Sequence, residues 1–146
     1  MRLHIGGHEV KAGWELLDIA AADGVDFVGD IADLSRFANG SCEQIYASHV
    51  LEHVPQAALL PTLVGLHRVL DAGGQALISV PDLEVLCRLF LDPALDLAAR
   101  WHVMRMMFGG QMDRYDFHFI GLTAEFLSEA LHRAGFTRIE RVEDFG

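Results

Sequence analysis

Short apolar runs recur along the first half of the chain, and they cover 3–5, 14–19, 26–30 and 44–48. Three of the four end at a glycine or an aspartate. Buried strands that deliver side chains to the carboxyl rim of a sheet typically show this pattern. We therefore predict four strands, with the turn Asn39-Gly40-Ser41 directly ahead of the fourth.

The middle of the chain changes to helical spacing. Apolar residues recur at that spacing from Pro55, which predicts a helix of about four turns capped by Gly73-Gly74. The run 76–80 has the composition of a fifth strand. Residues 83–108 are apolar but contain Pro93, so we predict two helices in place of one.

The last third begins with a polar and aromatic loop over 109–121. Thr123 is placed to cap the start of a further helix, and Gly135 is placed to end it. Residues 136–142 alternate between apolar and polar, which predicts a final edge strand.

Strands that alternate with helices indicate an α/β fold with a three-layer, doubly wound, mostly parallel sheet. At 146 residues the chain has the length of a single domain, 1–146. Only seven residues, 7–13, join the first two strands, so the first crossover helix is expected to be missing. Because the missing helix would leave an apolar patch uncovered, we expect a homodimer.

Composition narrows the classes of partner. The formal charge of −10 opposes binding to nucleic acid. No apolar run approaches the roughly 18–20 residues of a membrane span, and the first residues lack the pattern of a secretory signal. We expect a cytoplasmic protein without a membrane partner. Cys42 and Cys87 are too few for a disulfide framework or a cysteine-rich zinc site.

The pentapeptide from His49 to His53 spells HxxEH, the inverted zinc-protease motif. On a helix, His49 and His53 would share a face and could bind zinc, with Glu52 as general base. However, the pentapeptide begins where a predicted strand ends. A strand-to-helix junction in which Glu52 or His53 caps the next helix explains it as well, so we expect no metal and keep a zinc hydrolase as an alternative.

Seven segments in order resemble the small class I methyltransferases that use S-adenosylmethionine (SAM), and they cover nearly the whole chain. The family pattern runs LNIGCG, GWxNxDI, a DLPF segment, ASHVLEH, RVLKPGG, GGQ with a later His, and AGF. The matching segments here are LHIGGH at 3–8, GWELLDI at 13–19, GDIADLSRF at 29–37, SCEQIYASHVLEH at 41–53, RVLDAGGQALISVPDL at 68–83, GGQ at 109–111 with His118, and AGF at 134–136.

The resemblance implies a Rossmann-like methyltransferase fold with SAM at the rim of the sheet. Gly6 and Gly7 would let the backbone approach the methionine part of SAM, and Asp18 would accept hydrogen bonds from the ribose. The cofactor-binding residues that it implies are Gly6, Gly7, His8, Asp18, Ile19, Asp30, Ile31, Ser48 and His49.

The remaining roles concern the adenine and the reacting centre. Asp30 would accept from the adenine amine, while Ile31 would cover the ring. Ser48 and His49 would lie beside the sulfonium. His8 stands where the family has a glycine, so a second hypothesis is a methyltransferase-like binding or interaction protein with weak or no cofactor binding.

Methyl transfer needs a positioned acceptor and a base near neutral pKa. The loop 109–121 could fold over the site, and we predict that His118, with Asp116 or Tyr115 beside it, takes the proton. His49 is the further catalytic candidate. The acceptor is expected to be a small or sugar-like molecule.

Overall fold

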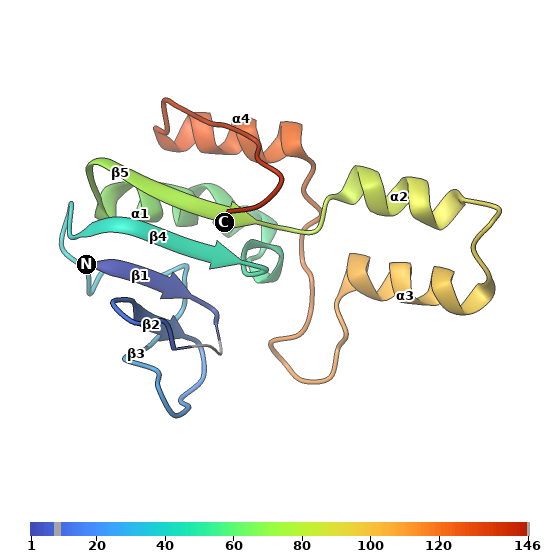
Figure 1. The fold of residues 1–146 in the computed structure, drawn as a ribbon, viewed down its shortest axis with the longest axis horizontal. Helices are drawn as coiled ribbons and strands as arrows, with labels where there is room; N and C mark the ends of the chain where they lie inside the picture. The colour runs from blue at the N-terminus through green and yellow to red at the C-terminus, as the bar shows by residue number, and fades with distance from the viewer. Residues whose placement is uncertain (8–9, 146) are drawn as a thin grey trace.

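The computed structural model describes residues 1–7 and 10–145, and its centre is a parallel five-stranded sheet (Figure 1). The strand order is β3-β2-β1-β4-β5, so the chain reverses its direction of travel between β1 and β4. The predicted α/β class and its Rossmann-like parallel sheet are confirmed. The strands are β1 Arg2–Ile5, β2 Glu15–Asp18, β3 Phe27–Val28, β4 Cys42–Ser48 and β5 Leu70–Ser79.

The connection between β1 and β2 contains no helix in its described part, as the sequence predicts. A turn in which the Trp14 amide donates to the Lys11 carbonyl, at 3.0 Å, returns the chain to the sheet. On this face Tyr46 is packed by Trp14 and Phe145 at ring-centroid distances of 6.3 and 5.9 Å. Loop and tail residues therefore cover what a crossover helix would cover.

Helices pack on the other face of the sheet. The helix α1 (Leu59–Val69) follows two short 3-10 turns, η1 (Leu51–His53) and η2 (Gln56–Ala58), and it contacts α4 (Ala124–Ala134). Alternate residues of β1 and β4 point toward α1 because side chains alternate along a strand. The buried core between them includes Leu3, Ile5, Ile45, Ala47, Leu59, Leu63, Leu66 and Val69.

Arg68 attaches the end of α1 to the segment after β3. Its guanidinium donates to the carbonyls of Leu34 and Phe37 and to Oδ1 of Asn39, at 2.8, 2.9 and 2.7 Å. Five donors in a planar fork suit this arrangement of three acceptors. The segment is thereby held against the helix without a strand of its own.

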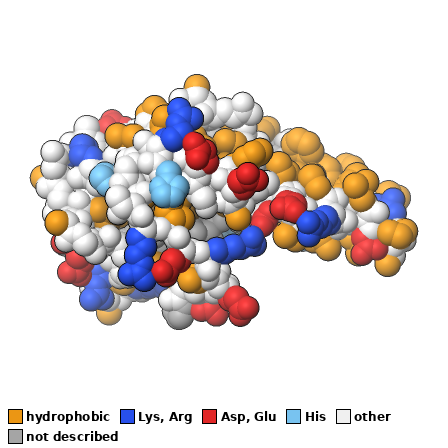
Figure 2. All heavy atoms as spheres, turned by 90° about the horizontal axis from the view of Figure 1, so that it is seen from above, with side chains coloured by type: hydrophobic (Ala, Val, Ile, Leu, Met, Phe, Trp, Pro, Cys, Tyr) orange, Lys and Arg blue, Asp and Glu red, His pale blue; other side chains and the backbone are white. Residues whose placement is uncertain are grey.

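Two helices form an arm that extends away from the sheet (Figure 1): α2 (Leu83–Leu91) and α3 (Leu97–Phe108), which contact each other. The break falls around Pro93, as predicted, and Asp82 and Asp96 cap the two helices with side-chain oxygens. Figure 2 shows hydrophobic side chains gathered over the arm. Those exposed are Val85, Leu89, Phe90, Leu91, Leu97, Trp101 and Phe108. None of the helices in the described residues is long and apolar enough to cross a membrane.

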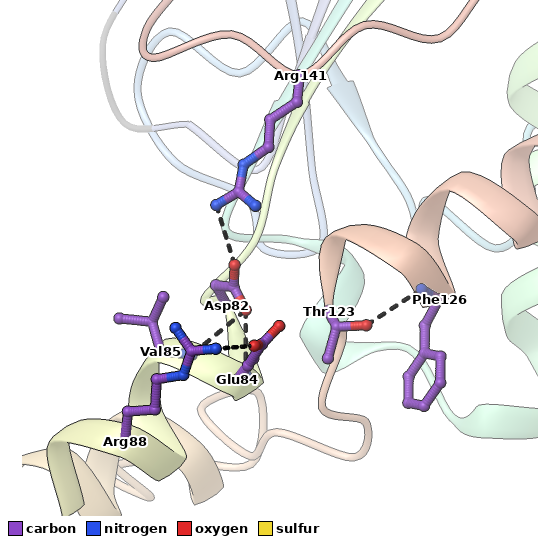
Figure 3. A network of polar contacts seen from close by, with 7 residues as sticks. All are labelled: Asp82, Glu84, Val85, Arg88, Thr123, Phe126 and Arg141. Atoms are coloured by element: carbon purple, nitrogen blue, oxygen red, sulfur yellow. Dashed lines mark hydrogen bonds and ion pairs between the residues drawn. The ribbon is translucent and has the colours of Figure 1, made fainter.

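The arm joins the sheet where α2 and α4 begin (Figure 3). Asp82 accepts hydrogen bonds from backbone amides of α2 and also from Arg141 of the C-terminal tail, at 3.0 Å. The Leu83 amide donates to the carbonyl of Leu122, at 2.9 Å. Thr123 caps α4 as predicted, accepting from the Phe126 amide at 3.1 Å.

The helix predicted from Pro55 differs at both ends, and α1 begins only at Leu59, after the 3-10 turn η2. The helix α1 ends at Val69, and Gly73-Gly74 lie within β5 in place of capping the helix. The cause is strand pairing: Leu70 already pairs with Cys42 of β4, and the register shifts before Gln75. The glycine pair therefore lies in an irregularity of the strand, where Gly73 has a φ of 91°.

The predicted edge strand over 136–142 is wrong. The described residues there form no strand. Phe136 and Ile139 instead pack against the core, and Arg138 pairs with Glu140 at 2.8 Å. Apolar and polar residues alternate in this segment because one side of the extended chain packs on the core and the other side faces solvent. This arrangement does not require a neighbouring strand.

Candidate functional site

Three neighbouring strands place the predicted cofactor residues side by side. Ile5 of β1 pairs with Leu17 of β2 and with Ala47 of β4. The next residues along these strands, Gly6, Asp18 and Ser48, therefore meet at one edge of the sheet. This edge lies at the β1/β4 reversal, where ligands bind in open α/β sheets.

The two glycines after β1 have neighbours that exclude a side chain. A Cβ on Gly6 would lie 2.6 Å from Cγ2 of Val50, and the φ of Gly6 is 72°. A Cβ on Gly7 would lie 2.1 Å from the ring of His4. Packing inside the protein is thus sufficient to require glycine at both positions, whatever binds at the rim.

Each acidic side chain at the rim accepts a hydrogen bond from a nearby backbone amide with one of its two oxygens. Oδ1 of Asp18 accepts from the Ala20 amide, and Oδ1 of Asp30 accepts from the Ala32 amide, at 2.8 and 2.9 Å. Among the described residues no donor reaches the second oxygen of either acid, so one oxygen of each is available to a ligand. Ile31 is buried in the core and offers little surface to an adenine ring, whereas Ile19 is exposed.

The hollow at this rim is small. Gly7, Leu16, Asp18, Ala20 and Val25 are among the residues that line about 100 Å³. Ligand pockets have volumes of roughly 300–1,000 Å³. A cofactor at this rim would therefore lie partly in the open. His8, the candidate that would crowd this pocket, lies outside the described residues.

His49 directly follows β4 and has an unusual backbone conformation. Its φ is 55°, and its amide donates to the Ser79 carbonyl at 3.0 Å. Residues held in this region cost free energy and gather at functional sites. The His49 side chain is 64% exposed, and its Nδ1 lies 3.2 Å from Oε1 of Glu52, which is 3% exposed. The buried carboxylate thus orients an exposed imidazole at the rim.

The HxxEH segment does not form the helix that a zinc protease needs. Only Leu51–His53 is helical, as a 3-10 turn, and His49 is in the left-handed region. The i, i+4 face shared by His49 and His53 is therefore absent. The capping interpretation is wrong too, because no side chain caps η1, η2 or α1.

The structure brings together a different set: Glu52, His53 and His118 offer ligand atoms within 4.8 Å of one another. Hydrogen bonds between η1 and the loop explain this, since the Phe119 amide donates to the Glu52 carbonyl at 2.8 Å. Sequence reasoning named His118 and the HxxEH segment separately but did not join them. Their contact depends on how the loop 109–121 folds back.

Asp116 has a structural contact in the same loop. Its Oδ2 accepts from the Met112 amide at 3.2 Å, and its carbonyl accepts from the Gln111 amide at 2.9 Å. His118, the residue it was expected to assist, donates from Nδ1 to the Met106 carbonyl at 2.9 Å. The carboxylate therefore holds the loop in shape. A catalytic role for Asp116 or His118 stays a prediction.

Comparison with known proteins agrees with this geometry. A family model described as a methyltransferase domain matches residues 9–78. A SAM-dependent methyltransferase from Archaeoglobus fulgidus superposes on 93% of the chain with a TM-score of 0.59 and 18% identity. The chain has the SAM-dependent methyltransferase fold. It spans 60% of that protein's length, and no curated protein matches it in sequence.

Two further methyltransferase structures show the same fold. One is a SAM-dependent methyltransferase from Thermotoga maritima, with a TM-score of 0.60 and 18% identity over 94% of this chain and 64% of its own. The other is a phosphoethanolamine N-methyltransferase from Haemonchus contortus in complex with SAM, with a TM-score of 0.56 and 16% identity over 95% of this chain and 33% of its own. The chain thus spans between about one third and two thirds of the length of these proteins.

Proposed function

We propose that this chain is a SAM-dependent methyltransferase whose acceptor is a small or sugar-like molecule. The observation that carries the proposal is the alignment of Gly6, Asp18 and Ser48 across three neighbouring strands at the sheet reversal. The methyltransferase-domain match over 9–78 supports it.

The rim residues present fit SAM. The second oxygen of Asp18 can accept from the ribose hydroxyls, and that of Asp30 can accept from the adenine amine. The Gly6 backbone lies at the same strand ends as Asp18, where the methionine part would pass. Ile19, exposed beside Asp18, provides apolar surface for the adenine in place of buried Ile31.

When bound, SAM would supply an electrophilic methyl group, which would pass to the acceptor nucleophile while the sulfur leaves in line as the thioether of S-adenosylhomocysteine. The protein's task is to position the acceptor and remove its proton. His49 is our candidate for the base because Glu52 orients its ring through Nδ1 and the His49 side chain is 64% exposed. A carboxylate behind an imidazole fixes its tautomer and stabilises the imidazolium that forms.

The loop 109–121 is the candidate acceptor surface. Tyr115, Phe117 and Phe119 are exposed on it, and the last two rings stack at a centroid distance of 6.4 Å. Loops carried on a rigid scaffold commonly determine specificity. Exposed rings beside the rim suit a sugar-like or other small acceptor.

The first test is isothermal titration with SAM and its demethylated product, S-adenosylhomocysteine. We expect binding that Asp18→Asn weakens about ten- to a hundredfold, as loss of a hydrogen bond to a charged group implies. Asp33→Asn is the matched control, because Asp33 caps the Ser35 amide in the same manner away from the strand ends. Absence of binding at millimolar concentration, or equal losses in both variants, contradicts the proposal.

A second candidate function is a methyltransferase-like binding protein that has lost the cofactor. The small hollow of about 100 Å³ at the rim favours it. Replacing His8 with glycine separates the two candidates. Cofactor binding that appears only in His8→Gly supports the second function, and equal binding in both proteins supports the first.

A further inference from the structure

The side chains of Glu52, His53 and His118 converge beside the rim. Glu52 and His53 come from η1, while His118 comes from the loop 109–121, and their ligand atoms lie within 4.8 Å of one another. The rings of His53 and His118 approach edge to face at a centroid distance of 4.8 Å.

The hydrogen bonds of the two imidazoles determine their tautomers. Nδ1 of His53 lies 3.1 Å from the Phe117 carbonyl, and Nδ1 of His118 lies 2.9 Å from the Met106 carbonyl. A carbonyl can only accept, so both Nδ1 atoms carry the proton. In a neutral ring this leaves a lone pair on Nε2. Metal-binding histidines are oriented by this kind of bond to a backbone carbonyl.

The carboxylate has an unsatisfied oxygen. Glu52 is 3% exposed; Oε1 lies beside His49, whereas Oε2 is buried and has no hydrogen-bond partner among the described residues. A buried charged oxygen without a partner is costly, so a cation or a donor is expected there. Glu52 and His118 also line a hollow of about 10 Å³, close to the volume of one water-sized sphere.

We propose that Glu52, His53 and His118 bind a divalent transition-metal ion, with zinc as the best fit. Two imidazoles and one carboxylate form a known donor set for catalytic zinc, and such sites keep a fourth position open for water or substrate. Tetrahedral zinc needs its ligand atoms about 3.3–3.4 Å apart, which is shorter than the 4.8 Å within which one ligand atom of each residue lies, so the side chains must move closer when the metal binds.

This site differs from the one that HxxEH suggests. Glu52 is a ligand and not the base, and His118 replaces His49 as the second imidazole. Through its two oxygens Glu52 would join the metal to His49 at the rim. The proposal concerns metal binding by the free protein and does not depend on methyl transfer.

The experiment measures zinc affinity of chelator-treated protein by competition with a chromophoric chelator. We expect one zinc per chain in the wild type, with Mg²⁺ failing to compete because imidazole is a poor ligand for it. Glu52→Gln and His118→Gln should each weaken binding by more than the roughly 10–100-fold typical of lost outer-shell contacts. His132→Gln, an exposed histidine on α4, is the matched control and should bind as the wild type does.

Circular dichroism in chelator checks that each variant is folded. If a variant is not folded, X-ray absorption of the wild-type zinc complex takes the place of that variant's affinity measurement, and the spectrum should show two imidazole ligands. Failure of the wild type to bind zinc, equal affinity in His118→Gln, or a spectrum without imidazole overturns the proposal. S-adenosylhomocysteine binding measured on the same samples tests the methyltransferase function independently.

Discussion

Replacing Gly6 with alanine tests whether internal packing requires glycine after β1. The substitution places a Cβ 2.6 Å from Cγ2 of Val50 at a residue whose φ is 72°. Val50 is β-branched, so its methyl groups cannot move aside without leaving a preferred rotamer. We expect a loss of stability from both the backbone and the contact.

The two contributions can be separated with Gly13→Ala. Gly13 has a φ of 80°, but a Cβ there meets nothing within 4 Å. Gly13→Ala should therefore lower the free energy of unfolding by the backbone cost alone, about 1–2 kcal/mol. Gly6→Ala adds overpacking of about 1–3 kcal/mol, for a total of about 2–5 kcal/mol. The change in unfolded-chain entropy is the same in both variants and cancels in the comparison.

Urea unfolding gives the free energies, provided that the slope with denaturant is unchanged. Val50→Ala in the Gly6→Ala background should recover part of the difference, and the coupling from the double-mutant cycle measures the contact. Equal losses for Gly6→Ala and Gly13→Ala, or no coupling with Val50, would refute the steric argument.

Three other predictions concern stability, reactivity and assembly. Arg68→Met should lower the free energy of unfolding by about 2–4 kcal/mol in urea titration, because three acceptors lose a charged donor; an unchanged midpoint would contradict this. Burial raises the pKa of the Cys42 thiol, whereas Cys87 is exposed. A thiol reagent should therefore modify only Cys87 in the native protein and both cysteines after denaturation, and mass spectrometry counts the modified residues. We also expect a homodimer by light scattering that Leu97→Glu on the exposed arm converts to monomer; a monomeric wild type at micromolar concentration would disprove it.

Elements that depend on local chemistry were predictable from the sequence. Apolar runs located β1 to β4, since burial on both faces of a parallel strand selects such runs, and glycine or aspartate closed three of the four. Pro93 divides α2 from α3, and Thr123 and Gly135 bound α4, because each acts on its own backbone.

Elements that depend on distant partners were not predictable. Gly73-Gly74 look like a helix cap, but pairing of Leu70 with Cys42 extends β5 through them. Residues 136–142 have a strand's alternation and no strand partner in the described structure.

The same division applies to the site. The sequence by itself determined the parallel α/β class, a β1–β2 connection without a helix in its described part, and the rim residues Gly6, Asp18 and Ser48, because strand-end positions follow from strand positions. Only the tertiary structure decided the neighbours of the Glu52 carboxylate. One of its oxygens contacts Nδ1 of His49, and the carboxylate also lies within 4.8 Å of a ring nitrogen of His118. Segments far apart in sequence become neighbours through backbone hydrogen bonds such as that from the Phe119 amide to the Glu52 carbonyl, and no local pattern encodes those.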